Sequence, residues 1–151
     1  MKIYLAGSIS GGRIFENNLL KISNILENMG HTVMTKDSVV KTNDLKKSNT
    51  LLLSFRKFIV KRDLKWIKNS DLFIAEVSTY SHGVGYEHRC AEEFKKPILL
   101  LRHASLQKER YSAFLDGQSY DKMNFSFYDS GNIRKVLERF IKKYERKIYS
   151  H

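Results

Sequence analysis

The chain has 151 residues, of which 42% are apolar, 28% charged and 12% aromatic. This composition is typical of a single folded domain over residues 1–151 and excludes a disordered chain. One cysteine, Cys90, excludes an internal disulfide framework, and no apolar run approaches the roughly 20 residues of a membrane span. With 27 basic and 16 acidic residues the net charge is +11, which suits nucleic acid, anionic small molecules or simply a soluble surface.

The N-terminal segment and the lone thiol both bear on location. The apolar run after Lys2 spans only residues 3–6, which is too brief for a signal peptide. A single cysteine is compatible with a reducing compartment. We therefore expect a cytoplasmic protein, or a nuclear one if its source is eukaryotic.

Short apolar runs alternate with longer amphipathic stretches along the chain. In the stretches, apolar residues recur every three or four positions, which indicates one helical face, while the runs suit buried strands. Gly30 stands where a glycine that ends a helix is expected. Two polar stretches, residues 36–50 and 102–118, are expected to be connections, the second with one helical turn near Ser112. The expected elements in chain order are a strand at 3–6, a helix at 14–29, a strand at 31–35, a helix at 51–68, a strand at 72–77, a helix at 86–94, strands at 98–101 and 125–128, and a helix at 132–149.

This alternation of strands and helices predicts an α/β fold. Short, continuously apolar strands are typical of a mostly parallel sheet with helices on both faces. Right-handed crossovers make such a sheet doubly wound and Rossmann-like, here with five strands. Ligands bind beyond the carboxyl ends of the strands in these sheets. Three segments should share that edge: residues 7–13, 78–87 and 102–117.

The first of these segments, from Gly7 to Arg13, follows a strand and opens a helix. Its glycines would let the backbone approach a ligand closely, and free N–H groups at a helix start favour an anion such as phosphate. The segment matches neither the Walker pattern nor the dinucleotide pattern. A tight strand-to-helix turn explains the glycines equally well. Arg13 opposes the helix dipole, which favours an anionic partner for it.

The second segment, residues 78–87, places Glu87 in the first turn of a helix directly after a glycine-rich loop. A glutamate there can serve the helix dipole alone. Because this loop should lie beside the first one, Glu87 can also face whatever the first loop holds. His82 and His88 are expected in solvent, and Cys90 is expected to be a small buried apolar residue.

Two further segments contain candidate residues. Asp63 lies in a basic stretch, where pairing with a lysine or arginine at the surface is the simplest expectation. Trp66, three residues further on, is expected in the core. The stretch from Tyr111 to Gly117 is expected to be a solvated turn.

Five segments taken together resemble the pattern of a known family. The most specific is Gly-Val-Gly-Tyr-Glu at residues 83–87, which follows an Ala-Glu-Val strand. The others are Tyr4-Leu5-Ala6-Gly7-Ser8-Ile9-Ser10-Gly11-Gly12-Arg13, Asp63-Leu64-Lys65-Trp66, residues 71–77 and Ser112-Ala113. In this order the chain, from Lys2 to about Gly117, resembles the nucleoside 2-deoxyribosyltransferase superfamily. Within it the likeness is greatest to the 2'-deoxynucleoside 5'-phosphate N-hydrolases.

The resemblance implies a small flavodoxin-like fold that forms a homodimer. It also implies hydrolysis of the N-glycosidic bond of a deoxynucleoside 5'-monophosphate, which releases the base and 2-deoxyribose 5-phosphate. By this likeness Glu87 is the nucleophile at the anomeric carbon, Asp63 holds the sugar hydroxyl or the nucleophile, and Tyr4 lines the sugar and base pocket. The substrate-binding residues implied, with Ser112 reaching in from the neighbouring subunit, are Gly7, Ser8, Ile9, Ser10, Gly11, Gly12, Arg13, Ser81, Gly83 and Ser112.

These residue types suit that chemistry. Glycoside cleavage passes through an oxocarbenium-like state, which a carboxylate stabilises and can trap covalently before water releases the sugar. Asp63 close to Glu87 would raise one of the two pKa values. The sequence shows no clear general acid for the base. No cofactor is expected, and no Cys/His cluster offers a metal site.

The chain departs from the family pattern at two places. Many of the nucleotide hydrolases have arginine in the first loop where this chain has Ser10, so Arg13 or a lysine from residues 36–50 would have to supply that phosphate contact. After Glu87 the family often continues with Leu-Gly-Arg, whereas this chain has His-Arg-Cys at residues 88–90. The missing glycine would change how this helix packs at a dimer interface.

Three alternatives stay open beside the hydrolase. Two are enzymes: a nucleoside 2-deoxyribosyltransferase and a CMP-type ribonucleotide N-glycosidase. The third is a non-catalytic basic module that binds nucleotides or nucleic acid. Its support is the charge: residues 41–68 include nine basic and two acidic side chains, and residues 134–147 include seven basic and two acidic ones. The aromatic residues of the last helix have core spacing and do not form a stacking platform. We therefore expect a small-molecule nucleotide as the partner, and neither nucleic acid nor a membrane.

Overall fold

The computed structural model describes residues 1–8, 16–36, 53–113, 117 and 119–148. Residues 9–13 of the first loop and residues 37–50 of the first polar stretch lie outside the described part of the chain. Within it, the strands and helices follow one another in the expected order, with a short 3-10 turn added. The elements are β1 (Lys2–Gly7), α1 (Glu16–Asn28), β2 (Thr32–Val33), α3 (Leu53–Asn69), β3 (Leu72–Glu76), α4 (His82–Glu93), β4 (Ile98–His103), η2 (Ala104–Leu106), β5 (Met123–Tyr128) and α6 (Ile133–Ile148).

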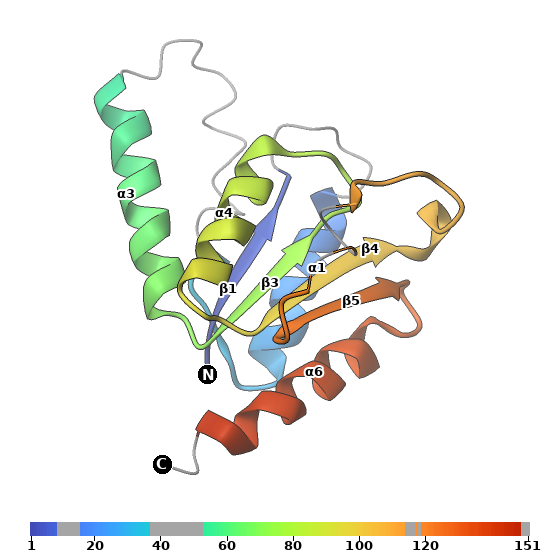
Figure 1. The fold of residues 1–151 in the computed structure, drawn as a ribbon. Coiled ribbons are helices and arrows are strands. Elements are labelled where there is room, and N and C mark those ends of the chain that lie inside the picture. The colour runs from blue at the N-terminus through green and yellow to red at the C-terminus, as the bar shows by residue number, and fades with distance from the viewer. Residues whose placement is uncertain (9–15, 37–52, 114–116, 118, 149–151) are drawn as a thin grey trace.

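The strands of the described residues form one five-stranded sheet in the order β2-β1-β3-β4-β5 (Figure 1). All four neighbouring pairs are parallel. The predicted doubly wound α/β sheet is therefore confirmed. The chain leaves β1 toward β2 on one side and returns to β3 on the other, and ligands bind at the carboxyl ends of strands that flank such a reversal.

Helices cover both faces of this sheet, with α3 and α4 on one face and α1 and α6 on the other (Figure 1). Because successive strand side chains point to opposite faces, β1 contributes to both layers. Ile3 and Leu5 pack against α1 and α6, whereas Tyr4 and Ala6 belong to the core cluster under α3 and α4. Tyr4 therefore faces the two helices that contain Asp63 and Glu87.

Helix α4 begins four residues earlier than expected, and the prediction of a helix start near Tyr86 is wrong. The Ser81 side chain accepts a hydrogen bond from the Val84 N–H and caps a helix that begins at His82. Gly83 and Gly85 lie inside the helix, and of the described glycines only Gly30 has a positive φ, +85°. Serine is a strong helix cap, and its signal outweighs the two glycines, which each cost about 1 kcal/mol relative to alanine.

Two other glycines have clear structural roles. Gly30 ends α1 as expected: its N–H donates to the Glu27 carbonyl, and the next N–H, of His31, donates to Leu26, which is the Schellman arrangement. At Gly7 a Cβ atom would lie 2.6 Å from a methyl carbon of Leu19. A side chain at Gly7 would force Leu19 to move, so the close packing of α1 against β1 favours glycine there, whatever its loop binds.

The connection expected after residue 101 begins later than predicted. Strand β4 continues through Arg102, which is only 2% exposed, to His103. Near Ser112, where a helical turn is expected, the Gly117 N–H donates to the Ala113 carbonyl, and the residues between them lie outside the described part of the chain. None of the helices in the described part of the chain has the length and apolarity that a membrane crossing requires.

Candidate active site

A hydrogen bond between Tyr4 and Glu87 joins β1 to α4 across 83 residues of sequence. The Tyr4 hydroxyl donates to Glu87 Oε1 at 3.0 Å. Tyr4 is 2% exposed, and its ring stacks on Phe73 of β3 with the centroids 5.6 Å apart. Glu87 is half-buried in the second turn of α4 rather than in the first turn, where we expected it. The two residues lie next to each other, as the resemblance implies.

The surroundings of Glu87 raise its pKa from 4.5 to about 7. Burial is the main cause, because it disfavours the charged carboxylate. The hydrogen bond from Tyr4 acts in the opposite direction, the charge of Asp63 raises the pKa further, and Arg62 lowers it. The expected influence of Asp63 on one carboxyl pKa is thus confirmed. At neutral pH, Glu87 is close to half ionised.

Asp63 lies in α3 and forms a salt bridge with its neighbour Arg62, 2.8 Å from Nη2 to Oδ1. The guanidinium of Arg62 also lies over the Trp66 ring, 4.5 Å from its centroid. The expected pairing of Asp63 with a basic residue is confirmed, and Trp66 is only partly buried against the core. The same pair acts on Glu87 electrostatically. Sequence reasoning missed Arg62, because an arginine in a basic stretch carries no distinguishing signal.

These groups converge from β1, α3 and α4 on the carboxyl side of the sheet. Burial and the neighbouring acids raise the pKa of Tyr4, so its hydroxyl stays protonated and remains a donor. A carboxylate with a pKa near 7, held by a phenol and balanced by an ion pair, can act as a nucleophile or as an acid at neutral pH. Perturbed carboxyl groups of this kind are typical of catalytic sites.

The residues expected around the phosphate are only partly described. Gly7 and Ser8 lie at the carboxyl end of β1. Ser81 caps α4, and Gly83 is exposed in its first turn, with only the Ser81 Oγ within 4 Å of where a Cβ would lie. The remaining residues expected in this group, Ile9, Ser10, Gly11, Gly12 and Arg13, lie outside the described residues.

Ser112 lies in the connection that follows β4. It is exposed and lines a cavity of about 430 Å³ together with Ser81, Tyr80 and His88, and Glu87 is not among the residues that line this cavity. The structure therefore brings together Tyr4, Asp63 and Glu87, and separately brings Ser112 to Ser81.

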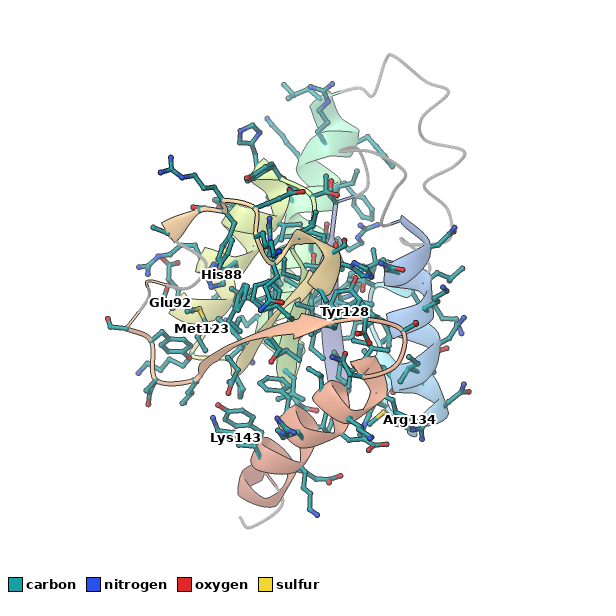
Figure 2. The ribbon with its side chains drawn as sticks, turned by 90° about the vertical axis from the view of Figure 1, so that its right-hand side faces the viewer. His88, Glu92, Met123, Tyr128, Arg134 and Lys143 are labelled. Carbon is teal, nitrogen blue, oxygen red and sulfur yellow. The ribbon has the colours of Figure 1, made fainter. Side chains whose placement is uncertain are left out.

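The expectation that His88 is exposed is wrong. It is 7% exposed, and burial lowers its pKa. His88 and Glu92 lie on α4 (Figure 2). The signal was present in the sequence: Val84, His88 and Ala91 have the spacing of one helical face, and all three are buried. It was missed because Val84 was assigned to a loop. The expectation for Cys90 is confirmed, since it is a free thiol and 7% exposed.

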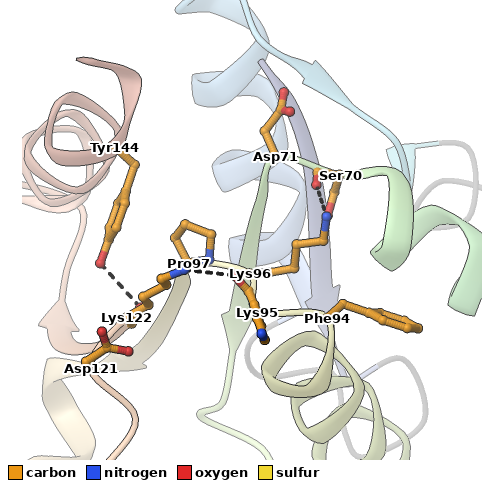
Figure 3. A pocket seen from close by; sticks show the side chains of 9 residues that line it. All are labelled: Ser70, Asp71, Phe94, Lys95, Lys96, Pro97, Asp121, Lys122 and Tyr144. Carbon is orange, nitrogen blue, oxygen red and sulfur yellow. Dashed lines mark hydrogen bonds between the residues drawn. The ribbon is translucent and has the colours of Figure 1, made fainter. Parts of the chain in front are cut away.

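A further cavity of about 380 Å³ lies at the opposite, amino-terminal edge of the sheet (Figure 3). Lys95, Lys96 and Lys122 line it. The ammonium group of Lys96 donates hydrogen bonds to the carbonyls of Lys68 and Ser70, so its role here is to link the segment before β4 to the end of α3. None of the expected site residues lines this cavity. Among the described residues, no three His, Cys, Asp or Glu side chains gather as a metal site would require.

Comparisons with known proteins place this fold in a class. The solved 2-deoxyribosyltransferase of Bacillus psychrosaccharolyticus superposes with a TM-score of 0.66 at 20% identity, over 91% of this chain and 90% of that one. The chain thus has the fold of the nucleoside 2-deoxyribosyltransferases. No family model matches it.

Relatives in sequence are more specific. The 5-hydroxymethyl-dUMP N-hydrolase of Tetraodon nigroviridis is 33% identical over 145 residues, which cover 93% of this chain and 96% of that protein. A protein of Methanococcoides burtonii named as a 2'-deoxynucleoside 5'-phosphate N-hydrolase is 33% identical over 120 residues, 80% of this chain and 93% of its own. The chain belongs to the 2'-deoxynucleoside 5'-phosphate N-hydrolase family.

Proposed function

We propose that the chain hydrolyses the N-glycosidic bond of 2'-deoxynucleoside 5'-monophosphates, with the free base and 2-deoxyribose 5-phosphate as products. The observation that carries this proposal is the half-buried Glu87, with a pKa of about 7, hydrogen-bonded to Tyr4. Relatives named as N-hydrolases over nearly the full length of the chain support the same reaction. We place the activity in the cytoplasm, where a single thiol stays reduced.

In the proposed mechanism, ionised Glu87 attacks the anomeric carbon while the bond to the base breaks. The bonding electrons leave with the base, which takes up a proton, and the sugar is held as an ester of Glu87 until water releases it. Tyr4 holds the attacking carboxylate through its hydroxyl. Asp63, fixed by Arg62, orients the sugar hydroxyl or the nucleophile.

We assign the phosphate to the carboxyl ends of β1 and β3. Backbone N–H groups and serine hydroxyls suit an anion there, and the N-terminus of α4 adds its dipole. Glu87 is not among the residues that line the cavity beside Ser112 of its own chain, which supports a site completed by the Ser112 of a second copy in a homodimer. The residues proposed to bind substrate are Gly7, Ser8, Ile9, Ser10, Gly11, Gly12, Arg13, Ser81, Gly83 and Ser112.

Product analysis tests the reaction. The protein is incubated with a panel of deoxynucleoside monophosphates, CMP and free deoxynucleosides, each with and without an acceptor base. We expect base release from deoxynucleoside monophosphates that is independent of acceptor, and none after Glu87→Ala. Equal activity on free nucleosides would contradict the monophosphate assignment, base exchange would indicate a transferase, and preference for CMP a ribonucleotide glycosidase. Full activity of Glu87→Ala would contradict the mechanism.

Mixing two impaired variants tests the shared site. Glu87→Ala lacks the nucleophile, and Ser112→Ala lacks the group expected from the neighbouring subunit. In a mixed dimer one site combines an intact Glu87 with an intact Ser112, so we expect activity to rise above that of either variant alone. If Ser112 serves its own chain, mixing will restore nothing.

A further inference from the structure

A buried carboxylate, Glu76, lies at the carboxyl end of β3 on the face opposite Tyr4. It is 3% exposed. The Ser78 N–H lies 3.3 Å from both of its oxygens, and the Ser78 hydroxyl donates to Oε1. The Tyr128 hydroxyl, from the end of β5, also donates to Oε1 at 2.9 Å. Glu76 is therefore satisfied by donors from two different strand ends.

The same cluster adjoins two further strands at this edge. Ser78 Oγ accepts the backbone N–H of His103 in β4 at 2.8 Å. The His103 and Tyr128 rings meet edge to face, with their centroids 5.4 Å apart. In β1 the residue paired with Glu76 is Gly7. Tyr128, which Figure 2 labels, thus closes a network that ties together the carboxyl ends of β3, β4 and β5, beside the carboxyl end of β1.

A carboxyl group in this position is costly to bury. Burial raises its pKa, while the hydrogen bonds from Ser78 and Tyr128 and the attraction of Arg102 lower it again. Buried ionisable groups are weak contributors to stability compared with packed apolar residues, so their presence calls for another role. The network adjoins two segments assigned to the phosphate: Gly7, which pairs with Glu76, leads into the first loop, and Ser78 leads to Ser81.

We propose that Glu76, together with Ser78 and Tyr128, is a positioning group for the phosphate-binding segments and so determines affinity for the phosphorylated substrate. This inference rests on the proposed function. Glu76 does not touch the substrate: it fixes the backbone that presents Ser8 and Ser81. Loss of the network should therefore weaken phosphate binding and leave the Tyr4–Glu87 chemistry on the other face intact.

The experiment compares Tyr128→Phe, Ser78→Ala and Glu76→Gln with Ser70→Ala. Ser70 is a matched control: it is a buried serine at the opposite end of β3, and its hydroxyl donates to the Ile67 carbonyl. For each protein, kcat and KM are measured with the best deoxynucleoside monophosphate. The dissociation constant of 2-deoxyribose 5-phosphate is measured by calorimetry, which needs no turnover. Tyr128→Phe and Ser78→Ala remove one donor each and keep the test valid if Glu76→Gln does not fold.

We expect KM and the dissociation constant to rise together, roughly five- to tenfold for one lost hydrogen bond, with kcat within about twofold of wild type. Ser70→Ala should lose comparable unfolding stability with KM unchanged. Unchanged KM and affinity in Tyr128→Phe and Ser78→Ala would overturn the proposal, as would an equal rise in Ser70→Ala. Absence of base release in the wild type would instead contradict the proposed function, and the calorimetric comparison would still decide the role of Glu76.

Discussion

Three neighbours shift the pKa of Glu87 in different directions, and their balance sets how much of the carboxylate is ionised. Tyr4 stabilises the carboxylate by hydrogen bonding, Asp63 destabilises it by like charge, and Arg62 offsets Asp63. Burial alone would leave the group mostly protonated at neutral pH. The arrangement keeps a nucleophile available in a partly buried site, where its charge acts more strongly on a developing cation than it would in water.

Substitutions of Tyr4 and Asp63 should move the acid limb of the rate profile in opposite directions. Glu87 must lose its proton to attack, so kcat/KM should rise with pH through its pKa of about 7. Tyr4→Phe removes the hydrogen bond that lowers this pKa, and the limb should shift to higher pH. Asp63→Asn removes a charge that raises it, and the limb should shift lower. A pH profile of kcat/KM for the three proteins checks this, and shifts of the same sign would contradict it.

Glu87 should also lower the free energy of unfolding of the protein above neutral pH. Its folded pKa lies above the unfolded value, so the native state binds the proton more tightly, and stability falls as pH rises from 4.5 to about 7. Glu87→Gln removes this loss. We expect it to raise the free energy of unfolding by on the order of 2 kcal/mol at pH 8, allowing for partial exposure, with little change at pH 4. Urea titrations at both pH values measure the difference, and an equal effect at both would contradict the assignment.

The site residues were predictable to different degrees. Tyr4, Asp63 and Glu87 are distant in sequence, and only the family likeness brought them together before the fold was known. Glu76 carried a signal that was not used, because a charged residue within a buried strand is uncommon and usually has buried partners. Its partner Tyr128 lies 52 residues away, and no local pattern connects the two.

At the scale of elements, α4 shows why boundaries were harder to predict than order. Its first two turns contain Gly83 and Gly85, which normally argue against a helix. The Ser81 cap and the burial of Val84 outweigh that preference. With Val84 left out of the helix, the apolar face could not be recognised, and His88 was placed in solvent. Strand order, by contrast, followed from the pattern of short apolar runs.

Two glycines should respond to alanine with opposite signs. Gly85 is helical, and nothing lies within 4 Å of where its Cβ would be. Gly85→Ala should therefore raise the free energy of unfolding by up to about 1 kcal/mol through helix propensity. Gly30 has a φ of +85° at the end of α1. Because alanine is strained in this conformation, Gly30→Ala should lower the free energy of unfolding by about 1 kcal/mol. Chemical denaturation measures both, and destabilisation by Gly85→Ala would mean that other contacts fill this space.

At the scale of the whole molecule, the charge is spread away from the reacting groups. The net charge of +11 comes largely from residues 41–68 and 134–147. Two basic residues of α6, Arg134 and Lys143, are labelled in Figure 2. Arg134 forms a salt bridge with Glu138, and Lys143 donates a hydrogen bond to Asn124 of β5. Such surface charge contributes little stability, but it creates a positive field around the whole protein.

This field should speed capture of anionic substrates. We expect kcat/KM for a deoxynucleoside monophosphate to fall roughly two- to fivefold as ionic strength rises from about 0.02 to 0.2 M, because salt screens long-range attraction. Charge reversal at Lys135 and Lys142, exposed residues of α6, should flatten the dependence and leave kcat unchanged. A salt dependence that is the same in the reversed variant would show that the field does not steer substrate.

The strand order also has a consequence for folding kinetics. In the order β2-β1-β3-β4-β5, three of the four adjacent pairs join strands that are consecutive in the chain, and only β1 and β3 pair across an intervening strand. Parallel pairing of β1 with β3 must close the longest loop of the sheet, and its entropy cost precedes any gain from the contacts. The Tyr4–Phe73 stack forms only when this pair closes. We therefore expect the slow step of folding to be the one that brings Tyr4 onto Phe73, beside the reacting groups.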